Sequence, residues 1–467
     1  MSRSRGLRGS LAGIAAAALA GVSVPGAQAT VAAPRDARVA AAGWSVTTLA
    51  GGRQAWLLGV AALPGGGKAV LLDERQGRDH RLVLYRNAGG TPTNTLMTSV
   101  HSFAASLGAD ARGNVAVAWY TIPNGASHRQ AYFWAGRRVI ALTDGTRHAA
   151  DALAVAPDGH IAVAVSESSP GGGPARVSVR RSAFGGRLRS VEVGDLQYLY
   201  PNALALGPSG AVALGGAVRS DAGAFTSSLA VSVSRSVNAS FLPATKLAPA
   251  TVPAPNVPLA QGPTVGFGPE DTLIAATNTL KCLVGTGDLS EPCSPGLAGS
   301  TLQVWLWPPS DAGLGAPIRP SKARFAYLPV VVTSGPTTWL AWYEGATNRM
   351  DTLAVAKVAK RRLGTVRRLR LAAAEQPGSE LPIAAPAPGS ALRFYLPATT
   401  KQSSALHTVV MSPTGRFGTT STVVRGTLYA GPNTRASATP STGLVRDLVG
   451  WTSWDDRHGA HPRIAHP

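Results

Sequence analysis

One hairpin pattern recurs along this chain and limits the folds that the chain can adopt. The pattern is clearest over residues 153–165, where two short apolar runs flank Pro157, Asp158 and Gly159. Glycine tolerates positive φ and aspartate hydrogen-bonds the local backbone, so these residues favour a tight turn. Each run is too short for an ordinary helix. Because both faces of the runs are apolar, the pattern predicts a hairpin buried between two sheets.

Comparable hairpins repeat at a spacing of about 50 residues, which is typical of propellers and solenoids. In each, two apolar runs flank a turn that contains Gly, Pro, Ser or acidic residues. A second hairpin, in which Arg and Ser take alternate positions, follows most of them. The first hairpins cover residues 58–72, 103–120, 153–165, 203–218, 264–277, 325–343, 382–396 and 438–454.

The two hairpins of one unit together predict a four-stranded blade. Inner strands of a blade are apolar on both faces, whereas outer strands are solvated and carry edge charges. Trp119, Trp342 and Trp451 stand at matching positions of their units, which favours packing between neighbouring sheets over a ligand cage. No stretch shows a sustained apolar period of 3.6 residues. We therefore expect an all-β chain, a β-propeller of four-stranded antiparallel blades with few helices.

The repeated unit, apolar residues followed by Pro-Asp-Gly and Ala-Val-Ala, resembles the secreted bacterial β-propeller repeat proteins over residues 57–454. The resemblance implies a ring of blades. It carries over no catalytic residue, because the WD-repeat signature and the sialidase box Ser-x-Asp-x-Gly-x-x-Trp are absent from the sequence.

The two ends of the chain complement each other. Residues 44–49 alternate and indicate a lone strand, while the hairpin at 438–454 has no complete second hairpin after it. Joining them would close a propeller of eight blades over residues 44–454, the last blade combining N- and C-terminal strands. Seven blades is the alternative if the end of the chain packs elsewhere. We expect residues 455–467 to form a polar C-terminal tail.

The amino terminus has the pattern of a secretory signal peptide over residues 1–29. Arg3, Arg5 and Arg8 precede an apolar run at 11–24, and Ala27-Gln28-Ala29 fits a cleavage site after Ala29. A retained anchor is the alternative, although the run is shorter than the about 20 residues of a membrane span. We expect residues 30–43 to form a flexible leader. The sequence thus predicts a secreted or cell-envelope protein with no transmembrane segment after signal removal.

Cys282 and Cys293 are the two cysteines of the chain and stand in one Gly-rich segment. In an exported protein such a close pair favours a disulfide. A metal site is the alternative, but no further ligand stands at metal-binding spacing. We predict no metal and no cofactor. Asx-turn chemistry rather than calcium explains the acidic residues in the hairpin turns, which are Asp110, Asp158, Glu270 and Asp271.

The formal net charge of +20 favours weak attraction to anionic polymers. A composition biased to Ala, Gly, Arg and Pro explains the same charge without a partner. The densest basic segment falls on a predicted outer hairpin, where protection of a sheet edge is the simpler explanation and contact with a polyanion the functional one. The candidate polyanion contacts are Lys360, Arg361, Arg362, Arg367, Arg368 and Arg370.

The segments that lead from one unit to the next should gather at one face of the ring. Two of them carry groups suited to polar ligands, because tyrosine offers a flat apolar ring with a hydroxyl. Ordinary anchoring of loops is the alternative. The candidate ligand-binding residues are Asp195, Tyr198, Tyr200, Asn202, Arg324 and Tyr327.

These features favour a secreted, non-enzymatic β-propeller that binds or scaffolds a glycan or protein ligand at the cell surface, as a monomer. The alternative is an extracellular lyase or glycan hydrolase with its site at the mouth of the central channel. Two carboxylates, or His with Tyr and Arg, gathered at one point would favour the enzyme. A third possibility is electrostatic attachment to wall polymer or nucleic acid, which weakens steeply with salt.

Overall fold

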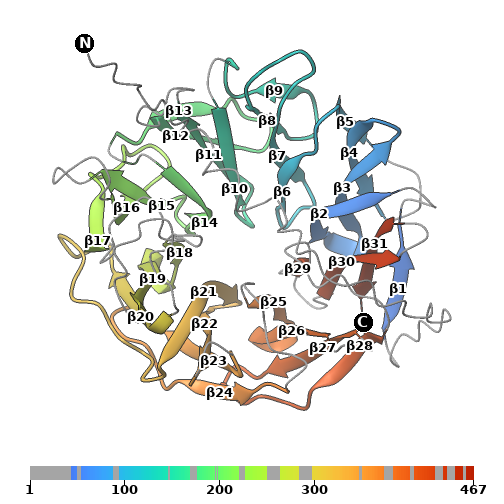
Figure 1. Cartoon of the computed structure of the whole chain (residues 1–467). Helices are drawn as coiled ribbons and strands as arrows, with labels where there is room; N and C mark the ends of the chain where they lie inside the picture. The colour runs from blue at the N-terminus through green and yellow to red at the C-terminus, as the bar shows by residue number, and fades with distance from the viewer. Residues whose placement is uncertain are drawn as a thin grey trace, which may run out of the picture.

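The ring of sheets expected from the hairpin repeat is present in the computed structural model (Figure 1). Eight antiparallel sheets surround a common axis, and seven of them have four strands within the described part of the chain. The prediction of an all-β, eight-bladed β-propeller is therefore confirmed. The structure describes residues 44–49, 54–87, 94–145, 148–168, 176–194, 196, 198–219, 227–249, 263–282, 297–346, 350–372, 382–399, 404–425, 435–438, 447–455 and 459–466.

Strands of each blade run outward from the axis in chain order until the last blade (Figure 1). Blade 1 contains β2 (Ala55–Ala62), β3 (Lys68–Gln76), β4 (Asp79–Arg86) and β5 (Asn94–Ser99). Blade 2 contains β6 (Ala104–Ala109), β7 (Val115–Thr121), β8 (Gln130–Trp134) and β9 (Val139–Ala141). Blade 3 contains β10 (His148–Val155), β11 (His160–Ser168), β12 (Arg176–Ala183) and β13 (Arg189–Glu192). Blade 4 contains β14 (Tyr198–Leu206), β15 (Val212–Arg219), β16 (Ser227–Ser234) and β17 (Thr245–Pro249).

The second half of the ring continues the same order. Blade 5 contains β18 (Thr264–Phe267), β19 (Leu273–Cys282) and β20 (Leu297–Trp307). An isolated bridge joins Val304 of β20 to Ile318, which lies outside the named strands. Blade 6 contains β21 (Phe325–Ser334), β22 (Thr337–Gly345), β23 (Thr352–Val358) and β24 (Arg367–Arg370). Blade 7 contains β25 (Ile383–Ala387), β26 (Ala391–Thr399), β27 (Ser404–Met411) and β28 (Ser421–Arg425).

Blade 8 joins the two ends of the chain. Its order is β29 (Arg435–Ala438), β30 (Asp447–Asp455), β31 (Gly459–His466) and, outermost, β1 (Ser45–Thr48). Ser45 pairs with His466, Thr48 pairs with Arg463, and the Leu49 amide donates to the Pro462 carbonyl at 3.0 Å. The closure by N- and C-terminal strands is thus confirmed.

The expectation that residues 455–467 form a tail outside the propeller was wrong. Residues 459–465 pair with β30, and Gly459–His466 form the third strand of blade 8. His461 and Arg463, which made the segment look like solvated tail, are 8% and 4% exposed. A strand placed between β30 and β1 has no solvent-facing edge, and this position buries even its polar side chains.

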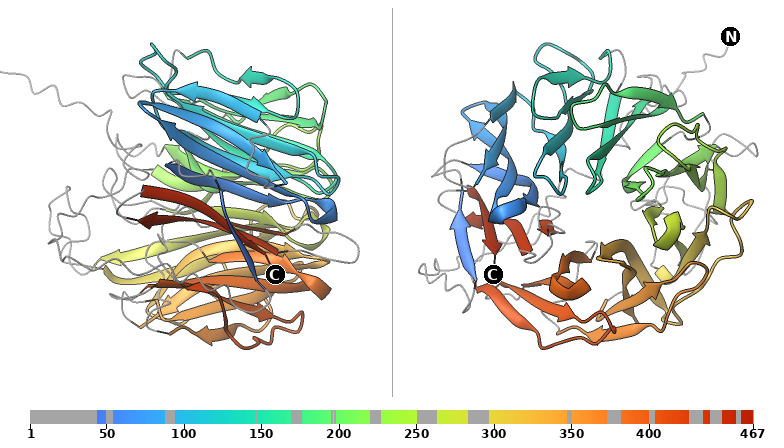
Figure 2. Two further views of the ribbon diagram at one scale, coloured as in Figure 1. Left: turned by 90° about the vertical axis from the view of Figure 1, so that its right-hand side faces the viewer. Right: turned by 180° about the vertical axis from the view of Figure 1, so that it is seen from behind.

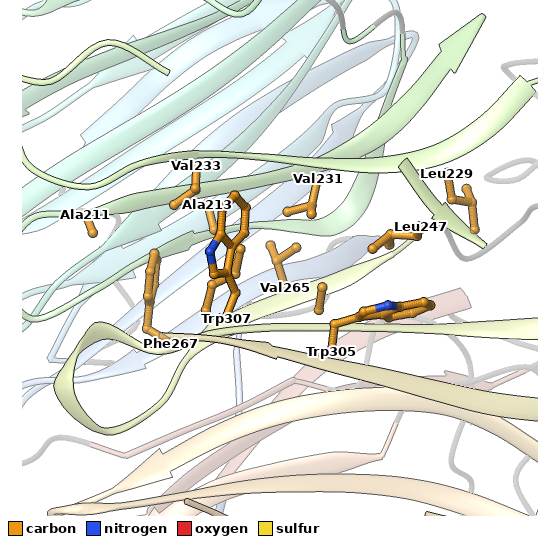
Figure 3. Close-up of a cluster of buried hydrophobic side chains, with 12 residues drawn as sticks. Ala211, Ala213, Leu229, Val231, Val233, Leu247, Val265, Phe267, Trp305 and Trp307 are labelled. Atoms are coloured by element: carbon orange, nitrogen blue, oxygen red, sulfur yellow. The ribbon is translucent and has the colours of Figure 1, made fainter. Parts of the chain in front are cut away.

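The core lies between the blades rather than within them, because each sheet packs face to face with its neighbours. Between blades 4 and 5, Trp305 and Trp307 of β20 cluster with Val231 and Val233 of β16 (Figure 3). At other blade boundaries, bulky residues on β7, β22 and β30 fill the same role, which confirms the predicted packing role of three tryptophans. Trp119, Trp342 and Trp451 are at most 1% exposed.

Inner strands of neighbouring blades approach too closely for large side chains on both. A Cβ added to Gly108 of β6 would lie 2.5 Å from Val155 Cγ2 of blade 3. A Cβ on Gly266 of β18 would likewise lie 2.5 Å from Val331 Cγ1 of blade 6. At these two contacts, a glycine on the inner strand of one blade therefore makes room for a valine on the inner strand of the next blade.

Strand direction divides the ring into two faces, seen edge-on in the left panel of Figure 2. Neighbouring strands of a blade are antiparallel, so the turns after the first and third strands lie on one face. We call this the turn face; it carries Pro64–Gly66 and Pro269–Asp271. The opposite face, which we call the loop face, carries the segments between blades and the starts of β14 and β21. The described residues contain no helix long and apolar enough to cross a membrane.

Candidate functional site

The tyrosine-bearing segments predicted to bind ligand begin inner strands of alternate blades. Tyr198 and Tyr200 lie at the start of β14 in blade 4, and Tyr327 lies near the start of β21 in blade 6. They share the loop face, with blade 5 between them (Figure 1). Asp195 lies outside the described residues, and for Tyr198, Tyr200 and Asn202 the structure describes only the backbone. Their role in binding stays a prediction.

Arg324, Phe325 and Tyr327 form a compact stack at the start of β21. The rings of Phe325 and Tyr327 stack with centroids 6.0 Å apart and 25° between their planes. The Arg324 guanidinium carbon lies 5.5 Å from the Phe325 centroid. Phe325 is buried, Tyr327 is half-buried and Arg324 is exposed. Burial raises the pKa of Tyr327. Arg324 is thus the exposed member of the stack, and the Tyr327 ring is partly exposed while its hydroxyl is buried.

The backbone of blade 5 holds this stack in position. The Ser300 amide donates to the Arg324 carbonyl at 2.9 Å, and the Ser300 hydroxyl donates to the Ala326 carbonyl at 2.7 Å. A Cβ on Gly299 would lie 2.7 Å from the Arg324 carbonyl oxygen, so only glycine permits this approach. The sequence gives no sign of this contact, because β20 and β21 are joined by a long segment.

The basic segment of blade 6 is exposed as predicted, but three of its six cations pair with carboxylates. Lys360 Nζ lies 2.5 Å from Glu270 Oε2, and Arg361 pairs with Asp311. Both acids belong to blade 5, so these pairs join two blades on the turn face. Arg368 Nε lies 2.7 Å from Glu344 Oε2. Among the described residues, the three without a carboxylate partner are Arg362, Arg367 and Arg370.

Glu344 at the end of β22 is a buried carboxylate that sequence reasoning missed. Its Oε1 accepts from Trp342 Nε1 at 2.9 Å, and Arg368 donates to both of its oxygens at 2.7 and 3.2 Å. Burial alone would raise the pKa of Glu344. Hydrogen bonds from Arg368, Ser321 and Trp342 and the charge of Arg368 outweigh burial and hold the pKa below its usual value. Arg368 is therefore a structural partner rather than a surface cation available to a polymer.

Removal of the Arg368 partner should destabilise the fold in a pH-dependent way. We expect Arg368→Gln to lower the free energy of unfolding by about 1–2 kcal/mol at neutral pH, since the arginine is partly exposed and screened. The folded-state pKa of Glu344 lies below its usual 4.5. Its contribution is therefore complete above that usual value and is lost as pH falls through the folded-state pKa. Urea denaturation midpoints from about pH 7 to about pH 3 measure this.

The control for that series is Arg370→Gln, which removes a charge two residues along β24 without touching Glu344. We expect its effect to stay within about 0.5 kcal/mol at every pH. A difference between Arg368→Gln and the wild-type protein that does not shrink on acidification would contradict the assignment.

Blade 1 carries two further buried carboxylates, Asp73 and Glu74, which adjoin each other on β3. Asp73 accepts from the Phe103 amide at 3.2 Å and contacts His80 Nδ1 at 2.9 Å; burial raises its pKa, although His80 and the Phe103 amide lower it. Glu74 accepts from the Tyr85 hydroxyl. Adjacent residues of a strand point to opposite faces of the sheet. The two carboxylates therefore face different neighbouring blades and do not form a catalytic pair.

Two of the four acidic turn residues, Asp110 and Asp158, act as the sequence predicts, whereas Glu270 pairs with Lys360 and Asp271 accepts from the Ser209 amide of blade 4. Asp110 Oδ1 accepts from the amides of Arg112 and Asn114 at 3.0 and 2.8 Å, and Asp158 Oδ1 accepts from the His160 amide at 3.1 Å. Both are Asx turns formed by local backbone donors. Within the described ranges, no three His, Cys, Asp or Glu side chains gather as a metal site. Cys293 lies outside these ranges, so its disulfide with Cys282 stays a prediction.

Comparison with known proteins shows only a weak similarity to solved structures. No family model and no curated protein matches the chain. The chain is similar to the polysaccharide lyase Uly1, with 10% identity over 79% of this chain and 89% of that chain and a TM-score of 0.40. It is similar to a Trypanosoma rangeli sialidase, with 9% identity, coverage of 86% and 60% and a TM-score of 0.40. A Dyadobacter fermentans protein of unknown function has 11% identity, coverage of 69% and 94% and a TM-score of 0.37. At these scores the likeness carries no argument about function.

Proposed function

We propose that this β-propeller is a secreted, non-enzymatic protein that binds a glycan or protein ligand at the cell surface through the loop face of blades 4 to 6. The observation that carries the proposal is the Arg324–Phe325–Tyr327 stack. It sits on the same face as the strand start that bears Tyr198 and Tyr200.

The chemistry of the stack suits binding. Aromatic side chains supply large, rigid contact area at low entropic cost, and Tyr and Arg are the residue types that dominate interface hot spots. The Phe325 ring contacts both Arg324 and Tyr327, and blade 5 holds their backbone by hydrogen bonds. A ligand with flat apolar faces and polar edges, such as a sugar or a peptide, would match this surface.

The state of the buried acids supports binding over hydrolysis or elimination. Each buried carboxylate in the described part of the chain accepts hydrogen bonds from structural donors. A general acid or base must instead face the reacting group at hydrogen-bond distance. These four acids are Asp73, Glu74, Asp110 and Glu344.

Export from the cytoplasm is part of the proposal. The signal pattern at 1–29 and the cysteine pair Cys282 and Cys293 support it, because disulfides persist in oxidising compartments. The exposed cations Arg362, Arg367 and Arg370 would add weak, salt-dependent attraction to anionic polymers.

A glycan and peptide array probed with the purified protein would identify a ligand, and two variants would then locate its site. We expect Tyr327→Ala and Arg324→Gln each to weaken binding of the best ligand at least about tenfold, which corresponds to about 1.4 kcal/mol. Arg425→Gln, an exposed change on the outer strand of blade 7, is the matched control and should change binding less than about twofold. Wild-type affinity in both loop-face variants, with their circular dichroism unchanged, would overturn the proposed site.

A further inference from the structure

A polar pocket opens on the turn face between blades 2 and 3, on the opposite side of the ring from the proposed ligand site. Its volume is about 360 Å³, within the about 300–1,000 Å³ of small-molecule sites. Turns after the first and third strands of both blades form its walls. The pocket is lined by Asp110, Arg112, Asn114, Ala135, Gly136, Arg137, Asp158, Gly159, Ala183, Phe184 and Gly185.

Two arginines supply positive charge on the blade 2 side of the pocket. Arg112 belongs to the turn between β6 and β7, and Arg137 belongs to the turn between β8 and β9. Both are exposed, and neither pairs with a carboxylate among the described residues. A guanidinium presents a planar fork of donors that matches a carboxylate. Two of them lining one pocket favour an anionic group on the ligand.

Neither aspartate of the pocket forms an ion pair with these arginines, so both guanidiniums keep their donors for a ligand. Both Asp110 oxygens are engaged within its own turn, since Oδ2 accepts from Asn114 Nδ2 at 2.8 Å and Oδ1 accepts from backbone amides. Asp158 Oδ2 lies 2.8 Å from His160 Nδ1. Burial raises the pKa of Asp158, but hydrogen bonds from His160 and its charge lower the pKa below the usual value. Asp158 is half exposed and keeps lone pairs for a hydroxyl donor.

Backbone hydrogen bonds join the turns that line the pocket, and Phe184 adds an apolar side chain to the lining. Gly159 has φ +96°, and a Cβ there would lie 3.2 Å from Asp110 Oδ2, so glycine keeps this space open. The Phe184 amide donates to the Gly159 carbonyl at 3.0 Å, and the Phe184 side chain is half-buried. The Ala111 amide donates to the Pro157 carbonyl at 2.9 Å and ties the two blades together. The walls therefore keep their geometry without a ligand.

We infer that this pocket binds an acidic sugar, a hexuronate unit of a polysaccharide. The carboxylate would contact Arg112 and Arg137, a ring face would cover Phe184, and hydroxyls would donate to Asp158. Such a ligand combines the anion, the apolar ring face and the hydroxyls that these groups fit. A simple anion would leave Phe184 and Asp158 unused, and a neutral sugar would leave the arginines unused.

Calorimetric titration of the full-length protein with oligogalacturonate tests the inference, with neutral galactose oligomers and oligoglutamate as comparison ligands. We expect oligogalacturonate to bind, the neutral oligomer to bind at least about tenfold more weakly, and oligoglutamate to do the same. The double variant Arg112→Gln with Arg137→Gln should weaken oligogalacturonate binding at least about tenfold.

The matched control is the double variant Arg362→Gln with Arg370→Gln, which removes the same charge from blade 6. It should change oligogalacturonate binding less than about twofold, and Tyr327→Ala on the loop face should leave it unchanged. Equal losses in the two double variants would assign binding to net charge and overturn the pocket. Equal binding of oligoglutamate would contradict the assignment of an acidic sugar as the ligand. If the wild-type protein did not bind oligogalacturonate, both the ligand and the pocket would be contradicted. A loss of oligogalacturonate binding in Tyr327→Ala would place that ligand on the loop face and overturn the pocket. The loop-face site itself is tested separately, with Arg324→Gln, Tyr327→Ala and the ligand that the array identifies.

Discussion

A chain that ends after Asp455 is expected to lose its closed ring and its cooperative unfolding transition. The truncation removes β31, which separates β30 from β1 in blade 8. Without it, β1 has no partner strand, and the face of blade 1 that packs on Ile464 is exposed. Ala460, Ile464 and Ala465 are each 0% exposed, so their burial is lost completely. The combined loss is comparable with the about 5–15 kcal/mol that stabilises a typical domain.

Size-exclusion chromatography and a thermal melt followed by near-ultraviolet circular dichroism would measure this result. We expect aggregation, or a monomer with no sharp transition, in place of the wild-type melt. A chain that lacks only Pro467 keeps all of β31 and serves as the control, with a melt indistinguishable from that of the full chain. A truncated chain that still melted like the wild-type protein would show that β31 is dispensable for closure.

The blade count was predictable because the signals that set it are local. Turns such as Asp158-Gly159 and the 3-10 turn Pro388–Ser390 recur at regular spacing, and each lies between two strands in the structure. The isolated strand near Trp44 and the missing second hairpin after Trp454 together predicted one blade built from both ends of the chain. Turn chemistry and strand alternation act over a few residues, so a single sequence displays them.

The role of the last strand was not predictable in the same way. Strand β31 reads Gly-Ala-His-Pro-Arg-Ile-Ala-His, which has the composition of a solvated tail. Its position between two strands depends on β1, more than 400 residues earlier in the chain. No local sequence preference indicates a pairing over such a distance. Long-range ring closure can therefore bury His461 and Arg463 against the preference of their residue types.

The candidate sites show the same limit. Arg324 and Tyr327 were found from local composition, but the stack with Phe325 and the contact with Ser300 depend on tertiary structure. Lys360 and Arg361 stood out as a basic cluster, although their acidic partners lie 90 and 50 residues away. Charge density is visible in a sequence, whereas charge pairing is not. Buried cations escape detection for the same reason.

Arg181 on β12 is such a buried cation, and it joins blade 3 to blade 4. It is 6% exposed, and among the described residues it pairs with no carboxylate. Its guanidinium donates to Ser234 Oγ at 2.8 Å, to the Ser236 carbonyl at 3.0 Å and to the Ala239 carbonyl at 2.8 Å. The guanidinium carbon also lies 5.6 Å from the Phe241 centroid. Ser234 ends β16, and the other two acceptors belong to the segment that leads from β16 to β17.

We expect Arg181→Met to lower the free energy of unfolding by about 2–4 kcal/mol. Hydrogen bonds from a charged donor contribute about 1.5–3 kcal/mol, and a buried acceptor that loses its donor adds a desolvation cost. The Ser234 hydroxyl lies within reach of both carbonyls but has one proton, so it cannot satisfy both. Methionine keeps much of the apolar volume, which restricts the loss to polar contacts. Urea denaturation midpoints at neutral pH measure the change.

Arg189→Met provides the matched control, because Arg189 of β13 stands directly opposite Arg181 in the strand register and is exposed. It should change the free energy of unfolding by less than about 0.5 kcal/mol. Arg181→Lys keeps the charge but loses the planar fork of donors, so we expect a loss between the other two. If Arg181→Met cost no more than Arg189→Met, the three hydrogen bonds would not hold blades 3 and 4 together. The join between these blades would then rest on apolar contacts such as Val177 and Val179 against Val212 and Leu214.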